Sequence, residues 1–203
     1  MSTTAQPAWQ ATQIPPFPVR RFTVDEYHRM VEAGVLTEND SVELLEGWIV
    51  AKMPHRPSHD ATIDQTGEVL RGQLPVGWRL RIQSAITTDD SEPEPDLAVV
   101  LGPPSRYAAH HPGPQDIALL IEVADSSLAH DREVKGRMYA RVGIAAYWII
   151  NLVDTQVEVY SEPSGPTANP GYRQHHTYRA GELIPLVIGS QSVAAIAACD
   201  LLV

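Results

Sequence analysis

Two carboxylates stand in stretches that otherwise have the composition of buried strands. Asp96 opens the apolar run 97–100, and Glu122 lies inside the run Leu-Leu-Ile-Glu-Val-Ala at 119–124. A buried carboxylate is costly unless a partner compensates its charge. Two such carboxylates on successive strands favour a shared cation, and hard cations such as Mg²⁺ prefer oxygen ligands. The pattern therefore indicates a site for metal-assisted hydrolysis of a phosphate ester.

A lysine follows on the next predicted helix, 131–142. Asp131, Lys135 and Tyr139 are spaced at i, i+4 and i+8, which places them along one helix face. If this face covers the end of the preceding strand, Lys135 could polarise an attacking water or balance charge on a phosphate. The alternative is a solvated Asp131–Lys135 pair with Tyr139 packed at its edge.

Each of the remaining candidates also has a purely structural interpretation. Glu43 lies among apolar neighbours in a short predicted strand, although a hairpin edge would also explain it. Asp96 alone is typical of a turn, and Glu122 alone of a buried pair with an arginine. His55 and His59 flank a loop and are candidates for substrate contact. No H-E-x-x-H, G-x-S-x-G or glycine-rich phosphate loop occurs, which leaves metal-assisted hydrolysis as the best class.

The elements that would position these residues alternate between helices and strands. Thr23 and Glu26 form a capping box for a helix that ends at Gly34, and Glu46-Gly47 is typical of a tight hairpin turn. The hairpin strands are predicted at 42–45 and 48–51, and further elements follow: a helix at 59–74, strands at 78–86, 96–101 and 117–123, a loop at 102–116, the helix at 131–142, strands at 145–152 and 157–160, a loop at 161–171, two weaker strands within 172–188, and a terminal helix or strand at 193–203.

This order predicts an α/β (or α+β) fold, a mixed β-sheet flanked by helices. The stretch 117–152 is long enough for a parallel strand–helix–strand crossover. At 203 residues the chain suits one domain, expected at 22–203, after a flexible N-terminal arm at 1–21. No apolar run approaches the ~20 residues of a membrane span, and no signal peptide is apparent, so we expect a cytoplasmic protein. The single Cys199 excludes an intramolecular disulfide and a cysteine-built zinc site.

The net charge of −10 argues against a generic nucleic-acid binder, which usually has a basic face. The basic residues are unevenly distributed, however, because thirteen of the fifteen Lys and Arg lie between Arg20 and Arg141. The predicted helix 131–142 alone holds four of them: Arg132, Lys135, Arg137 and Arg141. A basic rim beside an acidic site therefore remains compatible with a DNA substrate.

Six motifs in order resemble the Uma-two family of restriction-endonuclease-like proteins, within the PD-(D/E)XK nuclease superfamily. The resemblance spans roughly residues 22 to 190. The motifs are Phe22–Tyr27, Val42–Gly47, Pro95–Val100, Leu120–Val123 with Ser126-Ser127, Asp131–Tyr139, and Ala140–Ile144 with Tyr147-Trp148.

The resemblance implies a restriction-endonuclease-like core with a divalent-metal site. Asp96 and Glu122 would ligate Mg²⁺ or Mn²⁺ with the backbone carbonyl of Val123, and Glu43 would be an additional catalytic carboxylate. The superfamily lysine usually follows the strand glutamate by two residues, where this chain has Ala124. Lys135 therefore becomes the candidate lysine, and the implied reaction is hydrolysis of DNA phosphodiester bonds by a metal-bound, Lys135-assisted water. The candidate substrate contacts are His59, Arg132 and Tyr139.

Two other functions remain open at this point. One is a catalytically inactive nuclease-fold module that binds DNA or protein, and the other is a hydrolase of small phosphoesters, for which an acidic surface would be natural. A homodimer is expected in the nuclease case, because palindromic cutting and exposed strand edges both favour two-fold pairing.

Overall fold

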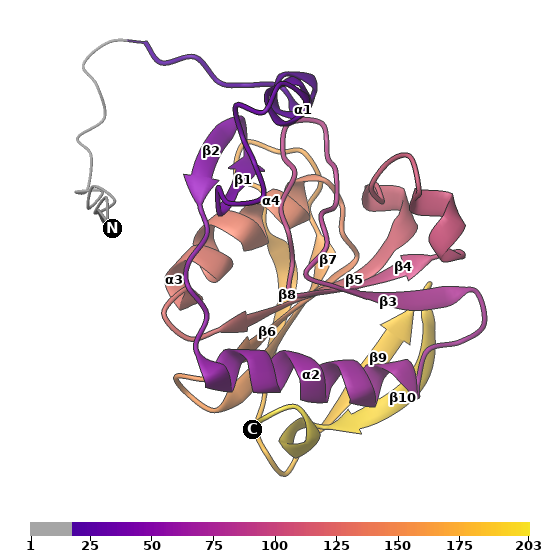
Figure 1. Ribbon diagram of the computed structural model, residues 1–203. Helices are drawn as coiled ribbons and strands as arrows, with labels where there is room; N and C mark the ends of the chain where they lie inside the picture. The colour runs from indigo at the N-terminus through magenta and orange to yellow at the C-terminus, as the bar shows by residue number, and fades with distance from the viewer. Residues whose placement is uncertain (1–17) are drawn as a thin grey trace, which may run out of the picture.

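A six-stranded mixed sheet is the centre of the fold (Figure 1). The computed structural model describes residues 18–203. Residues 1–17 of the predicted N-terminal arm lie outside the described residues, and residues 18–21 are exposed and without regular structure. None of the helices in the described part of the chain has the length and apolar character needed to cross a membrane.

The sheet has one parallel pair among antiparallel neighbours. Its strands follow the chain in order: β3 (Trp78–Ile82), β4 (Leu97–Leu101), β5 (Ile117–Ala124), β6 (Ala146–Asn151), β7 (Gln156–Pro163) and β8 (Tyr172–Tyr178). Only β5 and β6 pair in parallel. The parallel crossover predicted within 117–152 is therefore confirmed, as is the mixed sheet flanked by helices.

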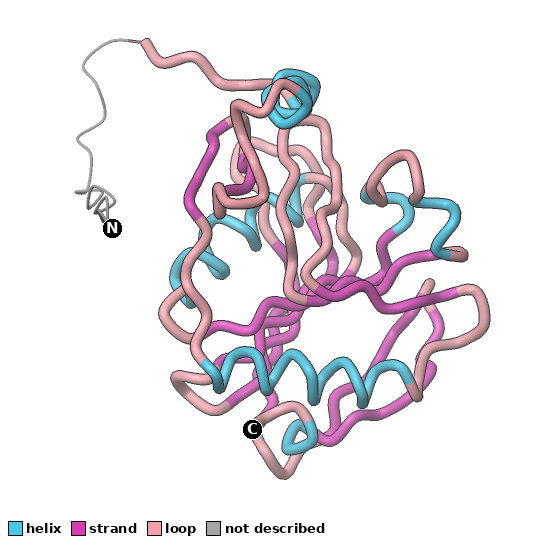
Figure 2. Tube along the Cα trace, in the orientation of Figure 1, coloured by secondary structure: helices cyan, strands magenta, loops and turns pink. Residues whose placement is uncertain are grey.

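Layers cover both faces of the sheet, as Figure 2 shows for the helices and the loops between them. One face packs on α2 (Pro57–Arg71) and on the hairpin of β9 (Leu183–Ile188) and β10 (Gln191–Ala197). The other face packs on the helical segment 128–141 and on the hairpin of β1 (Val42–Leu45) and β2 (Trp48–Ala51), next to α1 (Val24–Glu32). Because both faces are covered, every residue of β5 is buried, including Glu122.

The predicted helix 131–142 is helical but not uniformly α-helical. It consists of α3 (Leu128–His130), a π-helical turn (Asp131–Lys135) and α4 (Gly136–Arg141). The N–H of Gly136 donates to the carbonyl of Asp131, and the hydroxyl of Tyr147 donates to the same oxygen at 3.1 Å. A Cβ at position 136 would lie 3.3 Å from that oxygen, so glycine permits the wide turn. The apolar periodicity of a sequence does not reveal an i→i+5 hydrogen bond, so this turn was not predicted. Turns of the π-helical kind often occur at functional sites.

The remaining elements differ from prediction mainly at their ends. The capping box of α1 is present, with Thr23 and Glu26 bonding each other's backbone N–H groups. Strand β7 continues to Pro163, into the predicted loop. The predicted loop 102–116 contains two short 3-10 helices, and the terminal segment is β10 followed by the 3-10 turn Ala198–Asp200.

An ion pair between the exposed Arg132 and the buried Glu158 attaches the helical segment to β7. Arg132 Nε donates to Glu158 Oε2 at 2.9 Å, and a second guanidinium nitrogen donates to Oε1. Tyr160 and Asn151 also donate to this carboxylate, at 2.7 and 2.8 Å. Burial opposes ionisation of Glu158, but the hydrogen bonds outweigh it and lower its pKa to about 2.

We expect Glu158→Gln to destabilise the protein in a pH-dependent way. A pKa held below the ordinary 4.5 stabilises the fold fully above pH 4.5, and this stabilisation disappears as the pH falls towards 2. Chemical denaturation at pH 7 should show a free energy of unfolding about 2 kcal/mol lower than wild type, with a smaller difference at pH 3. Glu162→Gln, at an exposed position of β7, is the control and should differ little at either pH. An equal loss at both pH values would contradict the ionised pair.

Candidate functional site

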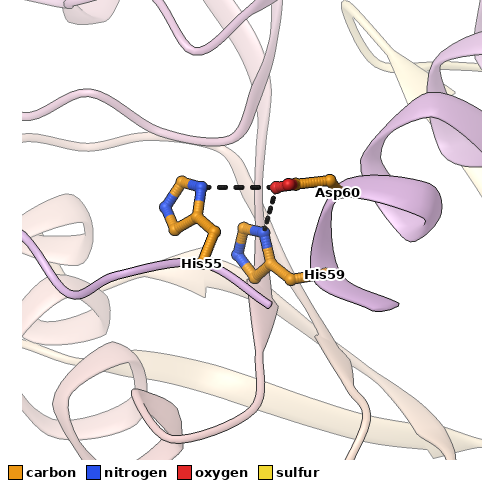
Figure 3. A group of neighbouring side chains, drawn as sticks. All are labelled: His55, His59 and Asp60. Atoms are coloured by element: carbon orange, nitrogen blue, oxygen red, sulfur yellow. Dashed lines mark ion pairs between the residues drawn. The ribbon is translucent and has the colours of Figure 1, made fainter. Parts of the chain in front are cut away.

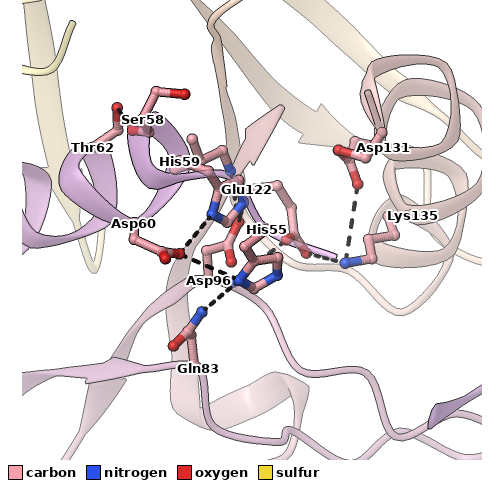
Figure 4. A network of polar contacts seen from close by, with 12 residues as sticks. His55, Ser58, His59, Asp60, Thr62, Gln83, Asp96, Glu122, Asp131 and Lys135 are labelled. Atoms are coloured by element: carbon pink, nitrogen blue, oxygen red, sulfur yellow. Dashed lines mark hydrogen bonds and ion pairs between the residues drawn. The ribbon is translucent and has the colours of Figure 1, made fainter. Parts of the chain in front are cut away.

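A cleft of about 690 Å³ opens where β5 ends against the helical segment, the β1–β2 hairpin and the start of α2. Its histidine side is drawn in Figure 3 and its wider polar network in Figure 4. Seven of the candidates named from the sequence line it: Glu43, His55, His59, Asp96, Glu122, Val123 and Lys135. Segments far apart in the sequence therefore bring these side chains to one place.

The register of β4 against β5 places Asp96 beside Glu122. The last paired residues of the two antiparallel strands are Leu97 and Ile121, so the next positions outward are Asp96 and Glu122. The N–H of Asp96 lies 3.4 Å from Glu122 Oε2, close enough for a long hydrogen bond. Both residues are nearly inaccessible, each with 6% or less of its surface exposed. The two carboxylates are thus neighbours because of strand pairing.

The backbone of Val123 also turns towards Asp96. Its N–H donates to Asp96 Oδ2 at 2.8 Å. In an extended strand the N–H and C=O of one residue point to the same edge, so this carbonyl is directed past the last pair of β4. Pro95 has no N–H with which to continue the ladder there. The carbonyl of Val123 is therefore suitably directed to act as an oxygen ligand.

Two donors from the helical segment hold Glu122 from the other side. Its Oε1 accepts from Lys135 Nζ at 3.0 Å and from the hydroxyl of Tyr139 at 2.9 Å. Burial raises the pKa of Tyr139 well above its ordinary range, so this hydroxyl stays protonated and remains a donor. Figure 4 shows Lys135 reaching from the helical segment towards the carboxylates. Together these bonds fix the orientation of the Glu122 carboxylate.

Two further carboxylates approach the same lysine. Glu43 Oε1 and Asp131 Oδ1 each lie 4.0 Å from Lys135 Nζ. The second oxygen of Glu43 accepts the N–H of Glu94 at 3.1 Å, and that of Asp131 accepts the hydroxyl of Ser127 at 2.6 Å. Three buried carboxylates, Glu122, Glu43 and Asp131, therefore approach a single lysine, and a fourth, Asp96, lies beside Glu122.

This excess of negative charge shifts the ionisation of the cluster. Burial raises the pKa of Glu122 to about 8, and Asp96 and Asp131 add to the shift although Lys135 opposes it. Burial alone would lower the pKa of Lys135, but the surrounding carboxylates raise it above its ordinary range, so the lysine stays charged. One cation does not balance four carboxylates, and the donor set is all oxygen. The residues present therefore fit a hard divalent cation such as Mg²⁺ or Mn²⁺.

The histidines lie closer to the carboxylates than the sequence indicated. His59 is in the first turn of α2 and is 8% exposed, with Nε2 3.3 Å from Asp96 Oδ2. His55 and Asp60 lie next to it (Figure 3). The sequence predictions did not identify Asp60, nor did they identify Asp131 as the fourth carboxylate of the acidic cluster. The H-x-x-x-H-D spacing at 55–60 is the signal that could have identified the first of these.

Two predicted substrate contacts lie away from the cleft surface. Arg132 points to β7, where Glu158 engages its guanidinium, and it does not line the cleft. Tyr139 is fully buried and its hydroxyl reaches Glu122. In this structure Arg132 anchors the helical segment and Tyr139 positions a carboxylate, and the contacts of these two residues with substrate stay predictions.

The sheet, its covering layers and the acidic cleft are those of a restriction-endonuclease-like domain. Residues 24–195 match the sequence model of the Uma2 family, described as "Putative restriction endonuclease", and the chain belongs to this family. The resemblance found in the sequence is thereby confirmed. No functionally curated protein matches the chain.

A solved structure has the same fold. It is described as "a putative nuclease belonging to DUF820" and comes from Anabaena variabilis ATCC 29413. The TM-score is 0.63 at 19% sequence identity, and the match covers 89% of this chain and 97% of that one. At this identity the likeness shows the fold alone.

Tyr139→Phe should destabilise the protein without altering the fold, because it removes one donor to a buried carboxylate. We expect the free energy of unfolding, measured by chemical denaturation, to fall by about 1–2 kcal/mol. Tyr178→Phe, at a half-buried tyrosine of the edge strand β8, is the matched control and should change stability by less than about 0.5 kcal/mol. Equal stability of Tyr139→Phe and wild type would show that this hydroxyl does not hold Glu122.

Proposed function

We propose that the protein is a metal-dependent endonuclease that hydrolyses DNA phosphodiester bonds in the cleft at the end of β5. The observation that carries the proposal is the pairing of Glu122, buried and bonded to Lys135, with Asp96 on the neighbouring strand. Membership of a family described as "Putative restriction endonuclease" supports the reaction class.

Asp96, Glu122 and the backbone carbonyl of Val123 would hold Mg²⁺ or Mn²⁺. Such a cation, when bound, stabilises negative charge on phosphate oxygens and favours ionisation of water. The two carboxylates are already oriented by backbone N–H groups, by Lys135 and by Tyr139. Preorganised ligands of this kind need little rearrangement when substrate arrives.

Lys135 acts as a donor in this proposal. Its raised pKa keeps it protonated, so it orients the attacking water and stabilises charge on the phosphate, and it does not remove a proton. Glu43 is our candidate acceptor for the proton of the water, because its Oε1 faces Lys135 at 4.0 Å. The water oxygen bonds to phosphorus as the ester P–O bond breaks, and the leaving oxygen takes a proton from solvent, which leaves a phosphate monoester and a hydroxyl end.

DNA is the proposed substrate, and basic residues on the cleft wall support it. Lys52 and Arg56 line the cleft, and each already pairs with a carboxylate, Glu94 and Asp125 respectively. The assembly we propose is a homodimer, because β3 and β8 are the outer strands of the sheet. The net charge of −10 favours the second candidate, hydrolysis of small phosphoesters, which would need no extended basic face.

A cleavage assay on the two lysine variants separates catalysis from general attraction of DNA. With Mg²⁺ or Mn²⁺, we expect wild type to cut DNA and Lys135→Met to lose at least about 100-fold in rate, because Lys135 acts at the reacting phosphate. Lys52→Met removes the other lysine of the chain from the same cleft, and we expect it to lose less than about 10-fold.

Two outcomes would count against the proposal. Intact single- and double-stranded DNA after incubation with either metal would exclude the nuclease reaction, and turnover of a small aryl phosphate by the same preparation would favour the second candidate. Equal losses in the two lysine variants would show that Lys135 contributes only charge.

A further inference from the structure

Two imidazoles and one carboxylate converge at the mouth of the cleft, beside the acidic cluster. His55 comes from the loop after β2, while His59 and Asp60 come from the first turn of α2. Asp60 Oδ1 lies 3.5 Å from His55 Nδ1 and 3.6 Å from His59 Nδ1, and the three atoms lie within 4.8 Å of one another. Figure 3 shows both rings presenting these nitrogens to the carboxylate.

The buried ring of His59 has an orphaned nitrogen. Its Nδ1 has no hydrogen-bond partner among residues 18–203, although the residue is buried, with only 8% of its surface exposed. On the other side of the ring, Nε2 faces Asp96 Oδ2 at 3.3 Å. A carboxylate accepts hydrogen bonds, so the network assigns the proton of a neutral ring to Nε2. Nδ1 then carries a lone pair directed towards Asp60.

His55 Nδ1 also carries a lone pair, which accepts from Gln83 in this structure and which a bound ion would take over from that amide. The amide Nε2 of Gln83 lies 3.3 Å from His55 Nδ1, and an amide nitrogen can only donate (Figure 4). When both rings are neutral, two imidazole lone pairs and an anionic oxygen face one another. This arrangement is repulsive unless a cation or a proton lies between them.

We propose that His55, His59 and Asp60 form a second cation site, for a divalent transition ion of the zinc class. Donors bound to zinc at about 2.0–2.1 Å in tetrahedral geometry lie about 3.4 Å apart, close to the 3.5 and 3.6 Å separations here. The three protein ligands leave a coordination position open to the cleft. Asp96 would serve as the outer carboxylate that orients His59, an arrangement common at metal-bound histidines.

The second site differs from the acidic cluster in its chemistry. Two imidazoles with one carboxylate favour zinc, cobalt or nickel, whereas the all-oxygen cluster favours magnesium or manganese. Asp96 contacts both groups, through His59 on one side and Val123 on the other. The inference does not rest on the nuclease reaction, since it concerns binding of an ion by residues outside the four carboxylates.

Cobalt absorption spectroscopy on the metal-free full chain tests this site directly. We expect wild type to bind Co²⁺ with visible d–d bands that added Zn²⁺ abolishes. His55→Gln should weaken Co²⁺ binding at least tenfold. This variant should fold normally, because 40% of the His55 side chain is exposed. Glu122→Gln should retain the bands. His110→Gln, at an exposed histidine outside the cleft, is the matched control and should match wild type.

Three results would overturn the proposal. Wild type without Co²⁺ bands would mean that the imidazoles share a proton with Asp60 and bind no metal. Bands that persist in His55→Gln, or that disappear in Glu122→Gln while remaining in His55→Gln, would assign the ion elsewhere. Because the readout is absorption, a protein that fails to cut DNA would leave this test unaffected.

Discussion

The contact on which the site depends is the one between Glu122 and Lys135. Strand β5 is buried on both faces, so a carboxylate in its middle requires donors, and Lys135 and Tyr139 provide them from the helical segment. The pairing constrains the fold as well as the site, because it requires the segment 128–141 to pack over this end of the sheet. Removing Lys135 would leave the buried carboxylates around it without their cation.

The surrounding structure adds negative charge to this contact. Strand register brings Asp96 beside Glu122. The β1–β2 hairpin brings Glu43 towards Lys135, and the π-helical turn brings Asp131 towards the same lysine. A fold selected for stability alone would favour apolar residues at such positions. The accumulation of buried like charge therefore supports the proposed cation site.

The sequence predicted the parts of this arrangement that follow from local pattern. Strands β4 and β5 are apolar runs, so their carboxylates were conspicuous, and the parallel crossover followed from the spacing of 117–152. The π-helical turn was not predictable from apolar periodicity. The sequence did not reveal that Arg132 pairs with Glu158, because the burial of Glu158 depends on tertiary packing. The proximity of His59 to Asp96 likewise depends on where α2 lies against the sheet.

The central claim is that Asp96 and Glu122 bind a divalent metal ion together. Calorimetric titration of Mn²⁺ or Mg²⁺ into wild type and Glu122→Gln tests it most directly, with circular dichroism to verify that both are folded. The account predicts binding by wild type and at least tenfold weaker binding by Glu122→Gln. Equal affinity in the two folded proteins, or no binding by wild type, would contradict it.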